Sequence, residues 1–169
     1  ERFSTRILKE ACLDLPSKTY LRREVPLTKE QKQLYRQMKR LALAQFENGE
    51  LATTASVLTQ IMRLQQIVCG WLSPDDGEIE DIPNNRLSEL LAVTEEVQGK
   101  AIIWCSWTRD IHRIADTLRH RFGNEAVALY FGETPQKDRQ EIVGRFQDPD
   151  SALRFFVGQP RTGGFGLTL

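Results

Sequence analysis

Apolar residues recur every three or four positions through the first part of the chain, which is the spacing of one helix face. Thr28 and Gln31 form a capping box, so a first helix is predicted from there to about Glu47. A second helix is predicted over residues 51–69, with Gly70 as its natural end. Their apolar stripes comprise Leu34, Met38, Leu41 and Phe46 in the first helix and Val57, Ile61, Leu64 and Val68 in the second. Residues 28–72 are therefore expected to form a pair of helices.

The segments on either side of this helical pair are less regular. Residues 1–27 have no sustained period, and residues 20–27 resemble a strand that Pro26 would confine to a sheet edge. Residues 73–84 are rich in turn-forming and acidic residues, which is typical of a solvated loop. A further helix is predicted from about Asn85 to Val97, although Thr94 interrupts its apolar stripe.

From residue 100 onward, short apolar runs alternate with helical segments. Strands are predicted at 101–105, 126–131 and 153–157, with helices at 108–122 and 135–146 between them. The third strand leads into a glycine-rich loop. Strands separated by helices in this way predict right-handed β-α-β units and a parallel sheet that helices cover on both faces. The fold class expected for residues 85–169 is therefore α/β.

The composition is that of an ordinary water-soluble domain. Hydrophobic residues make up 40% and charged residues 27% of the 169 positions. Apolar runs are far shorter than the roughly 20 residues needed to cross a bilayer, so an intracellular protein without membrane association is expected. Cys12, Cys69 and Cys105 lie far apart, and their spacing indicates neither a disulfide framework nor a metal site.

The formal net charge of zero conceals an uneven distribution. Residues 1–50 contain 11 Lys or Arg and 7 Asp or Glu, and residues 99–169 contain 10 and 8. Residues 73–98 contain 1 and 8, so the acidity is local. The two mildly basic parts allow a surface that faces nucleic acid, although a mixed solvated surface accounts for the charges equally well.

Each predicted strand is followed by a hydroxyl group and an arginine. In a parallel sheet the carboxyl ends of the strands meet at one edge, and the helix N-termini there can hold phosphate groups. The sequence therefore predicts an edge that grips phosphates, while plain helix caps and loops are the structural alternative. The candidates are Ser106, Trp107 and Arg109 after the first strand, Thr134 and Arg139 after the second, and Arg161, Thr162, Gly163, Gly164 and Gly166 after the third.

The segment that leads from the second predicted strand into the following helix has an unusual charge pattern. Lys137 and Arg139 fall in the first turns of a predicted helix, where the helix dipole disfavours cations, and this favours an anionic partner. Other chemistry is absent from the sequence. It contains no phosphate-binding loop of the Gly-x-x-x-x-Gly-Lys-Ser/Thr type, no acidic pair at a strand end to hold magnesium, and no catalytic triad. The three tryptophans are expected to serve packing, with Trp107 also able to stack on a base.

Several blocks, in this order, resemble the second RecA-like lobe of the Swi/Snf family of DNA-dependent ATPases, within helicase superfamily two. The first block, Leu15-Pro-Ser-Lys18, is similar to the opening of the family's lobe, and the others follow at the family's spacing. Five blocks in register make the resemblance specific, and it covers nearly the whole chain. The remaining blocks span 61–69, 100–108, 130–146 and 156–169.

The resemblance implies a motor of two lobes, with ATP and double-stranded DNA bound across the cleft between them. Ser106, Trp107 and Arg109 would contact the DNA backbone, with Thr134 and Arg139 as weaker candidates. Arg161, Thr162, Gly163 and Gly164 would couple DNA to the nucleotide, and Gly166 would lie near its phosphates. ATP and Mg²⁺ would be bound mainly by the first lobe, which is also an implied partner of this chain.

Two departures from the family pattern limit these expectations. Gly158-Gln159-Pro160 stands where the family usually has Ser or Thr, which puts that phosphate contact in doubt. The sequence also ends at Leu169, before the family's arginine finger. The resemblance therefore implies a partial lobe that neither hydrolyses ATP nor translocates by itself and binds no cofactor strongly.

Two other functions are compatible with the sequence. One is a non-catalytic interaction module, in which the helical pair docks a protein partner and the α/β part serves as scaffold. The other is a lobe of an RNA helicase, which the helical insert and the Leu-Pro-Ser-Lys block disfavour through the family pattern.

Overall fold

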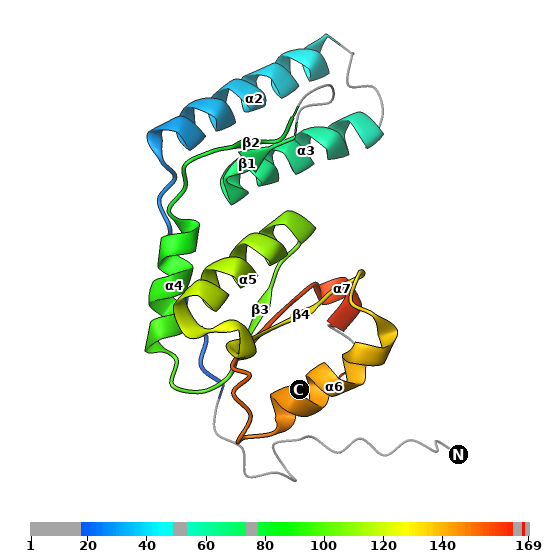
Figure 1. The fold of residues 1–169 in the computed structure, drawn as a ribbon. Coiled ribbons are helices and arrows are strands. Elements are labelled where there is room, and N and C mark those ends of the chain that lie inside the picture. Colours follow the sequence, from blue (N-terminus) through cyan, green and yellow to red (C-terminus); the bar gives the residue numbers. More distant parts are fainter. Residues whose placement is uncertain (1–17, 49–53, 74–77, 164–166, 168–169) are drawn as a thin grey trace, which may run out of the picture.

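A computed structural model of the chain describes residues 18–48, 54–73, 78–163 and 167 (Figure 1). The two helices of the segment 28–72, here called the helical insert, lie at one end of the molecule, and the α/β unit expected for 85–169 lies at the other. Most of the Leu-Pro-Ser-Lys block lies outside the described residues. The elements are α2 (Lys29–Glu47), α3 (Thr54–Cys69), β1 (Trp71–Leu72), β2 (Glu80–Asp81), α4 (Arg86–Glu96), β3 (Ala101–Trp104), α5 (Thr108–Phe122), a short 3₁₀ turn (Asn124–Ala126), β4 (Val127–Tyr130), α6 (Gln136–Gln147), β5 (Phe155–Gly158) and α7 (Pro160–Gly163).

The capping box predicted at the start of α2 is confirmed, and it also joins α2 to α3. The backbone N–H of Gln31 donates to Thr28 Oγ1, and the Gln31 side chain accepts from the Thr28 N–H in return. The Gln31 amide, 1% exposed, then donates to the carbonyl of Ile67 at 2.8 Å. A single buried glutamine therefore stabilises both the N-terminus of one helix and the last turn of the other, because an amide provides donor and acceptor groups together.

Gly70 ends α3, as the sequence predicts. Its φ of +89° lies in the region that side-chain-bearing residues avoid, and an added Cβ would lie 2.0 Å from the Asn84 side chain. The chain reverses here into a small antiparallel pair in which Trp71 faces Asp81 and Leu72 faces Glu80. The solvated loop expected over residues 73–84 is therefore corrected at Glu80–Asp81, which form strand β2.

Two further expectations for this half are wrong. Residues 18–28 have no regular secondary structure, so the strand predicted at 20–27 is not formed. Leu41 and Phe46 are 53% and 67% exposed rather than part of a buried stripe, and Val57 and Ile61 are also exposed. The start of the second helix at 51–53 lies outside the described residues.

In α4, Thr94 is the buried residue, because its hydroxyl donates to the Leu91 carbonyl at 2.8 Å and needs no water.

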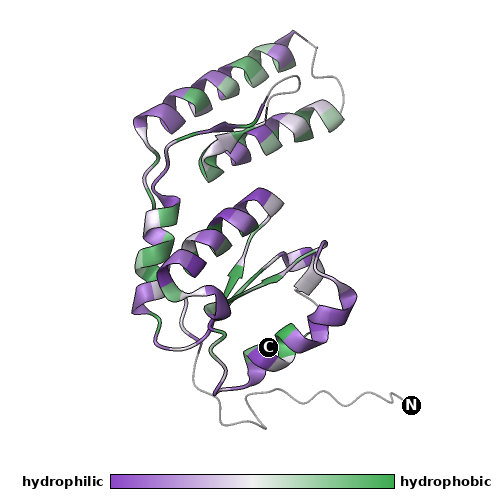
Figure 2. Ribbon diagram, viewed as in Figure 1, coloured by the Kyte–Doolittle hydropathy of each residue, from purple (hydrophilic) through white to green (hydrophobic). Residues whose placement is uncertain are grey.

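The predicted parallel sheet is confirmed, with the strand order β3-β5-β4. Strand β5 is central and buried on both faces, as a continuous apolar run in a parallel sheet should be. Phe155 and Val157 pack on the α5 side, and Phe156 packs on the α6 side with Phe146 and Leu153. Figure 2 shows the strands as mainly hydrophobic and much of α5 as hydrophilic, so the core follows the sheet.

Candidate nucleic-acid interface

The carboxyl ends of all three strands lie at one edge of the sheet. Trp104 of β3 and Tyr130 of β4 are both in register with Gly158 of β5. The backbone continues this alignment past the strand ends, since the Cys105 N–H donates to the Gly158 carbonyl at 2.8 Å and the Gln159 N–H donates to the Tyr130 carbonyl at 3.2 Å. We call this edge the rim, and define it as residues 105–107, 131–135 and 159–163.

Each of the three segments of the rim is a junction between a strand and the helix that follows it. The first junction, between β3 and α5, presents a helix N-terminus to solvent. Ser106 is exposed, and Trp107 is the N-cap of α5 with no side-chain hydrogen bond to the helix. Thr108 is therefore the first helical residue and not the cap. The side-chain amide of Gln159 donates to its hydroxyl at 3.5 Å, which links the start of α5 to the residue after β5. The free N–H groups at this end of α5 are therefore left for solvent or an anion.

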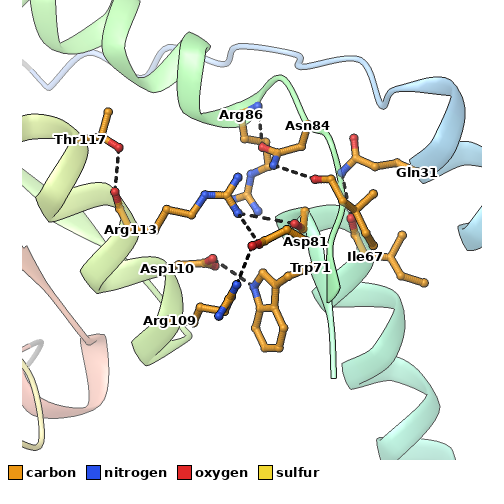
Figure 3. Close-up of polar contacts among 12 residues, drawn as sticks. Gln31, Ile67, Trp71, Asp81, Asn84, Arg86, Arg109, Asp110, Arg113 and Thr117 are labelled. Atoms are coloured by element: carbon orange, nitrogen blue, oxygen red, sulfur yellow. Dashed lines mark hydrogen bonds and ion pairs between the residues drawn. The ribbon is translucent and has the colours of Figure 1, made fainter. Parts of the chain in front are cut away.

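The first turns of α5 are held by the β1-β2 pair. Arg109 Nη2 lies 2.9 Å from Asp81 Oδ2, and Arg113 Nη1 lies 3.7 Å from Asp81 Oδ1 (Figure 3). The indole N–H of Trp71 donates to Asp110 at 3.1 Å, and the Trp71 ring packs edge-on against Trp107 with centroids 5.3 Å apart. We call these contacts of Trp71 and Asp81 with α5 the latch. They join the β1-β2 pair to the rim.

Arg109 is incompletely satisfied within this latch. Its side chain is 35% exposed, yet its Nε is buried and has no hydrogen-bond partner among the described residues. The carboxylate that holds it is 66% exposed, so solvent weakens the attraction between the two charges. Arg109 can therefore exchange Asp81 for another anion at modest energetic cost. Asp81 could not be identified from the sequence, because only the fold shows that this acidic segment lies against α5.

In the second junction, between β4 and α6, the candidate side chains hydrogen-bond to the backbone of their own turn. The Thr134 hydroxyl is buried, where it donates to the Leu129 carbonyl at 3.1 Å and accepts the Phe131 N–H at 3.0 Å. Arg139 donates to the backbone carbonyls of Phe131, Gly132 and Thr134 at 3.1–3.4 Å. Thr134 does not cap α6, since Pro135 holds that position without a side-chain hydrogen bond. Both side chains therefore close the turn between β4 and α6, which explains their presence without an anion.

The third junction is shaped by close packing. A Cβ on Gly158 would lie 2.6 Å from the Tyr130 carbonyl oxygen, and one on Gly163 would lie 3.1 Å from the Trp104 ring. These glycines therefore permit the backbone to approach the neighbouring strands and rings. The predicted glycine loop is helical over Pro160–Gly163, with Arg161 exposed and Thr162 half-buried. Gly164 and Gly166 lie outside the described residues.

The thiols of Cys69 and Cys105 are both held in the protonated form. Burial, followed by the charge of Asp110, raises the pKa of Cys105 to about 11. The same two causes raise the pKa of Cys69, against the opposing effect of Arg86. Both groups are therefore neutral thiols near pH 7, and the reactive thiolate form is disfavoured. Within the described ranges, no three His, Cys, Asp or Glu side chains are grouped so that they could hold a metal ion.

Comparison with known families gives a specific match. The family model described as "Helicase conserved C-terminal domain" matches residues 83–169, about half of the chain. A human protein, "SWI/SNF-related matrix-associated actin-dependent regulator of chromatin subfamily A member 1", is 32% identical over 83 residues, which are 49% of this chain and 8% of that protein. The Arabidopsis thaliana protein "CHROMATIN REMODELING 4" is 24% identical over 97% of this chain and 8% of its own length. The chain thus spans a small part of these relatives.

Solved structures show the same fold. The chain matches the "Sulfolobus solfataricus SWI2/SNF2 ATPase C-terminal domain" with a TM-score of 0.64 and 23% identity, over 86% of this chain and 64% of that one. It also matches the "Sulfolobus solfataricus SWI2/SNF2 ATPase core in complex with dsDNA" with a TM-score of 0.59 and 21% identity, over 80% and 29% of the two chains. No helix in the described part of the chain is long and apolar enough to cross a membrane.

Proposed function

Since the chain belongs to the helicase conserved C-terminal domain family, as a C-terminal lobe of the Swi/Snf type, we propose that its rim binds the phosphate backbone of double-stranded DNA within an ATP-dependent DNA translocase. The observation that carries the proposal is the parallel register, which brings three strand ends to one edge. The dsDNA complex of the Sulfolobus core, which has the same fold, supports it further.

The rim residues divide by role in this proposal. Ser106 and Arg161 are exposed, and Thr162, the residue after Arg161, is half-buried, so these side chains bind phosphate oxygens directly. Arg109 joins them when a phosphate replaces Asp81, and Trp107 holds the start of α5 in place through Trp71. Thr134 and Arg139 act as positioning residues that fix the turn after β4. Such contacts read charge and spacing rather than base sequence, as a motor that steps along DNA requires.

ATP and Mg²⁺ belong to the full-length protein in this proposal, which places part of the nucleotide site between this lobe and another. Gly163 is buried against Trp104 and Tyr130, and the described residues offer no metal-binding cluster. Gly163, Gly164 and Gly166 remain candidates for coupling DNA binding to hydrolysis elsewhere.

The test is DNA-stimulated ATP hydrolysis by the full-length protein. Ser106→Ala combined with Arg161→Ala should raise the duplex concentration needed for half-maximal stimulation by about tenfold or more, because charge-assisted hydrogen bonds to phosphate are lost. Arg121→Ala is the matched control, since Arg121 lies in the last turn of α5, away from the rim, and pairs with Glu95. Equal stimulation of the double variant and the control would contradict the proposal. Stimulation by RNA alone would favour an RNA helicase instead.

A further inference from the structure

One exposed side of α2, roughly a third of a turn around the helix from the face that packs on α3, carries a regular line of six residues that we call the α2 seam. Its six residues follow one another at spacings of 3, 4, 3, 4 and 3, which places them in a line along the helix for about 25 Å. The first four are cations and the last two are apolar. All six are exposed, Leu43 by 53% and Phe46 by 67%. The α2 seam comprises Lys29, Lys32, Arg36, Lys39, Leu43 and Phe46.

This seam is not needed to fold α2 against α3. The packed side is fixed at both ends by hydrogen bonds, from Gln31 to the Ile67 carbonyl at 2.8 Å and from Gln60 to Gln45 at 3.3 Å. At 100° per residue, the packed residues lie roughly a third of a turn around the helix from the seam. The seam cations form no ion pair with the described residues. In Figure 2, α2 is hydrophilic along much of its length, with hydrophobic segments between.

We propose that the α2 seam is a docking surface for an acidic amphipathic helix of a protein partner. Alternating spacings of three and four residues are what a second helix contacts when it packs alongside. The partner helix would place carboxylates over the cations of the seam and apolar side chains over Leu43 and Phe46. The apolar pair argues against DNA as the occupant, because phosphates gain nothing from burying a leucine and a phenylalanine.

The charges also argue against a second copy of this chain as the occupant. An antiparallel pairing of two α2 seams would place Arg36 opposite Lys39 and Lys29 opposite Phe46. A parallel pairing would place each cation near its own copy. Like charges that face each other across a helix pair are unfavourable, so the seam is complementary to a different, acidic helix. This inference concerns a surface other than the rim and does not depend on the proposed function.

The experiment measures binding of two probes to this chain by fluorescence anisotropy. One probe is a synthetic 20-residue helix with glutamates at alternating three- and four-residue spacing over one half and leucines over the other, and the second is a 20-base-pair DNA duplex. The variants are Lys32→Glu with Lys39→Glu, and Leu43→Ser with Phe46→Ser. Arg22→Glu is the matched charge reversal, on the exposed segment before α2. Circular dichroism checks that each variant keeps its helices, which is expected because the substituted side chains are exposed.

The proposal requires saturable binding of the peptide, weakened about tenfold or more in both double variants and unchanged in Arg22→Glu. Absence of saturable binding would overturn it. An unchanged affinity of the Leu43→Ser, Phe46→Ser variant would also overturn it, because the attraction would then be purely electrostatic. Tighter binding of the duplex than of the peptide, lost in the charge variant alone, would assign the seam to nucleic acid instead.

Discussion

The junctions after β4 and β5 have the same layout in sequence and opposite arrangements in space. Each has a threonine and an arginine just past a buried strand. After β4, Thr134 and Arg139 hydrogen-bond to the backbone of their own turn. After β5, Arg161 is exposed to solvent. Residue types at a strand end therefore identify the rim but do not show which side chains face outward.

The length of each connection explains the difference. Five residues, 131–135, separate β4 from α6, and their carbonyl groups need donors that Arg139 supplies. Only Gln159 separates β5 from α7, and its own carbonyl accepts the N–H groups of Thr162 and Gly163 at 3.0 Å each. The short connection is therefore satisfied by its backbone, which leaves the Arg161 side chain available.

The largest expected effect is on the free energy of unfolding, at the junction after β4. Arg139→Met should lower the free energy of unfolding by about 2 kcal/mol, because three backbone carbonyls lose a charged donor. Arg161→Met should change it by less than about 0.5 kcal/mol, as for an exposed side chain. Urea unfolding of both variants measures the difference. Equal destabilisation would show that the two junctions do not differ as described.

A smaller effect is expected at the latch. Asp81→Asn should lower stability by less than about 1 kcal/mol, because the carboxylate is largely exposed. It should also tighten duplex binding several-fold at low salt, since Arg109 no longer shares its charge with Asp81. Glu80→Gln, the neighbouring carboxylate on β2, is the control and should change the affinity less. Unchanged or weaker binding of Asp81→Asn would show that Arg109 does not reach the DNA.

A separate prediction concerns the thiol of Cys105, the first residue of the rim. Because its folded pKa of about 11 is above the ordinary thiol value, the thiol favours folding below that ordinary value, and this contribution is lost as the pH rises toward 11. Alkylation of Cys105 by iodoacetamide at pH 8, followed by peptide mass spectrometry, should be at least tenfold slower than alkylation of an unstructured cysteine peptide. Equal rates would show that the thiol is accessible and ionised normally.

The elements that were predicted well are those fixed by local patterns. The Thr28 capping box, the end of α3 at Gly70 and the span of α5 at 108–122 each follow from residues close together in the chain. The β1-β2 pair could not be predicted, because each strand has two residues and forms only through backbone pairing across the acidic segment. Exposure of Leu41 and Phe46 was also missed, since amphipathic spacing does not show how far the neighbouring helix covers a stripe.

The candidate site shows the same limit. The sequence placed Ser106, Thr134 and Arg161 at one edge correctly, because strand ends in a parallel sheet share an edge. It could not assign Thr134 to the interior or pair Arg109 with Asp81, because both depend on contacts formed only in the folded chain. The roles of these residues in DNA binding remain predictions.

Whether the rim binds the DNA backbone is tested by the salt dependence of duplex binding by this chain. The slope of log affinity against log salt concentration reports the number of phosphates that the protein neutralises. Arg161→Ala should reduce the magnitude of that slope by about one, while Arg121→Ala should leave it unchanged. A slope for Arg161→Ala equal to that of the unaltered chain would contradict DNA binding by the rim, because Arg161 would then not contact the DNA backbone.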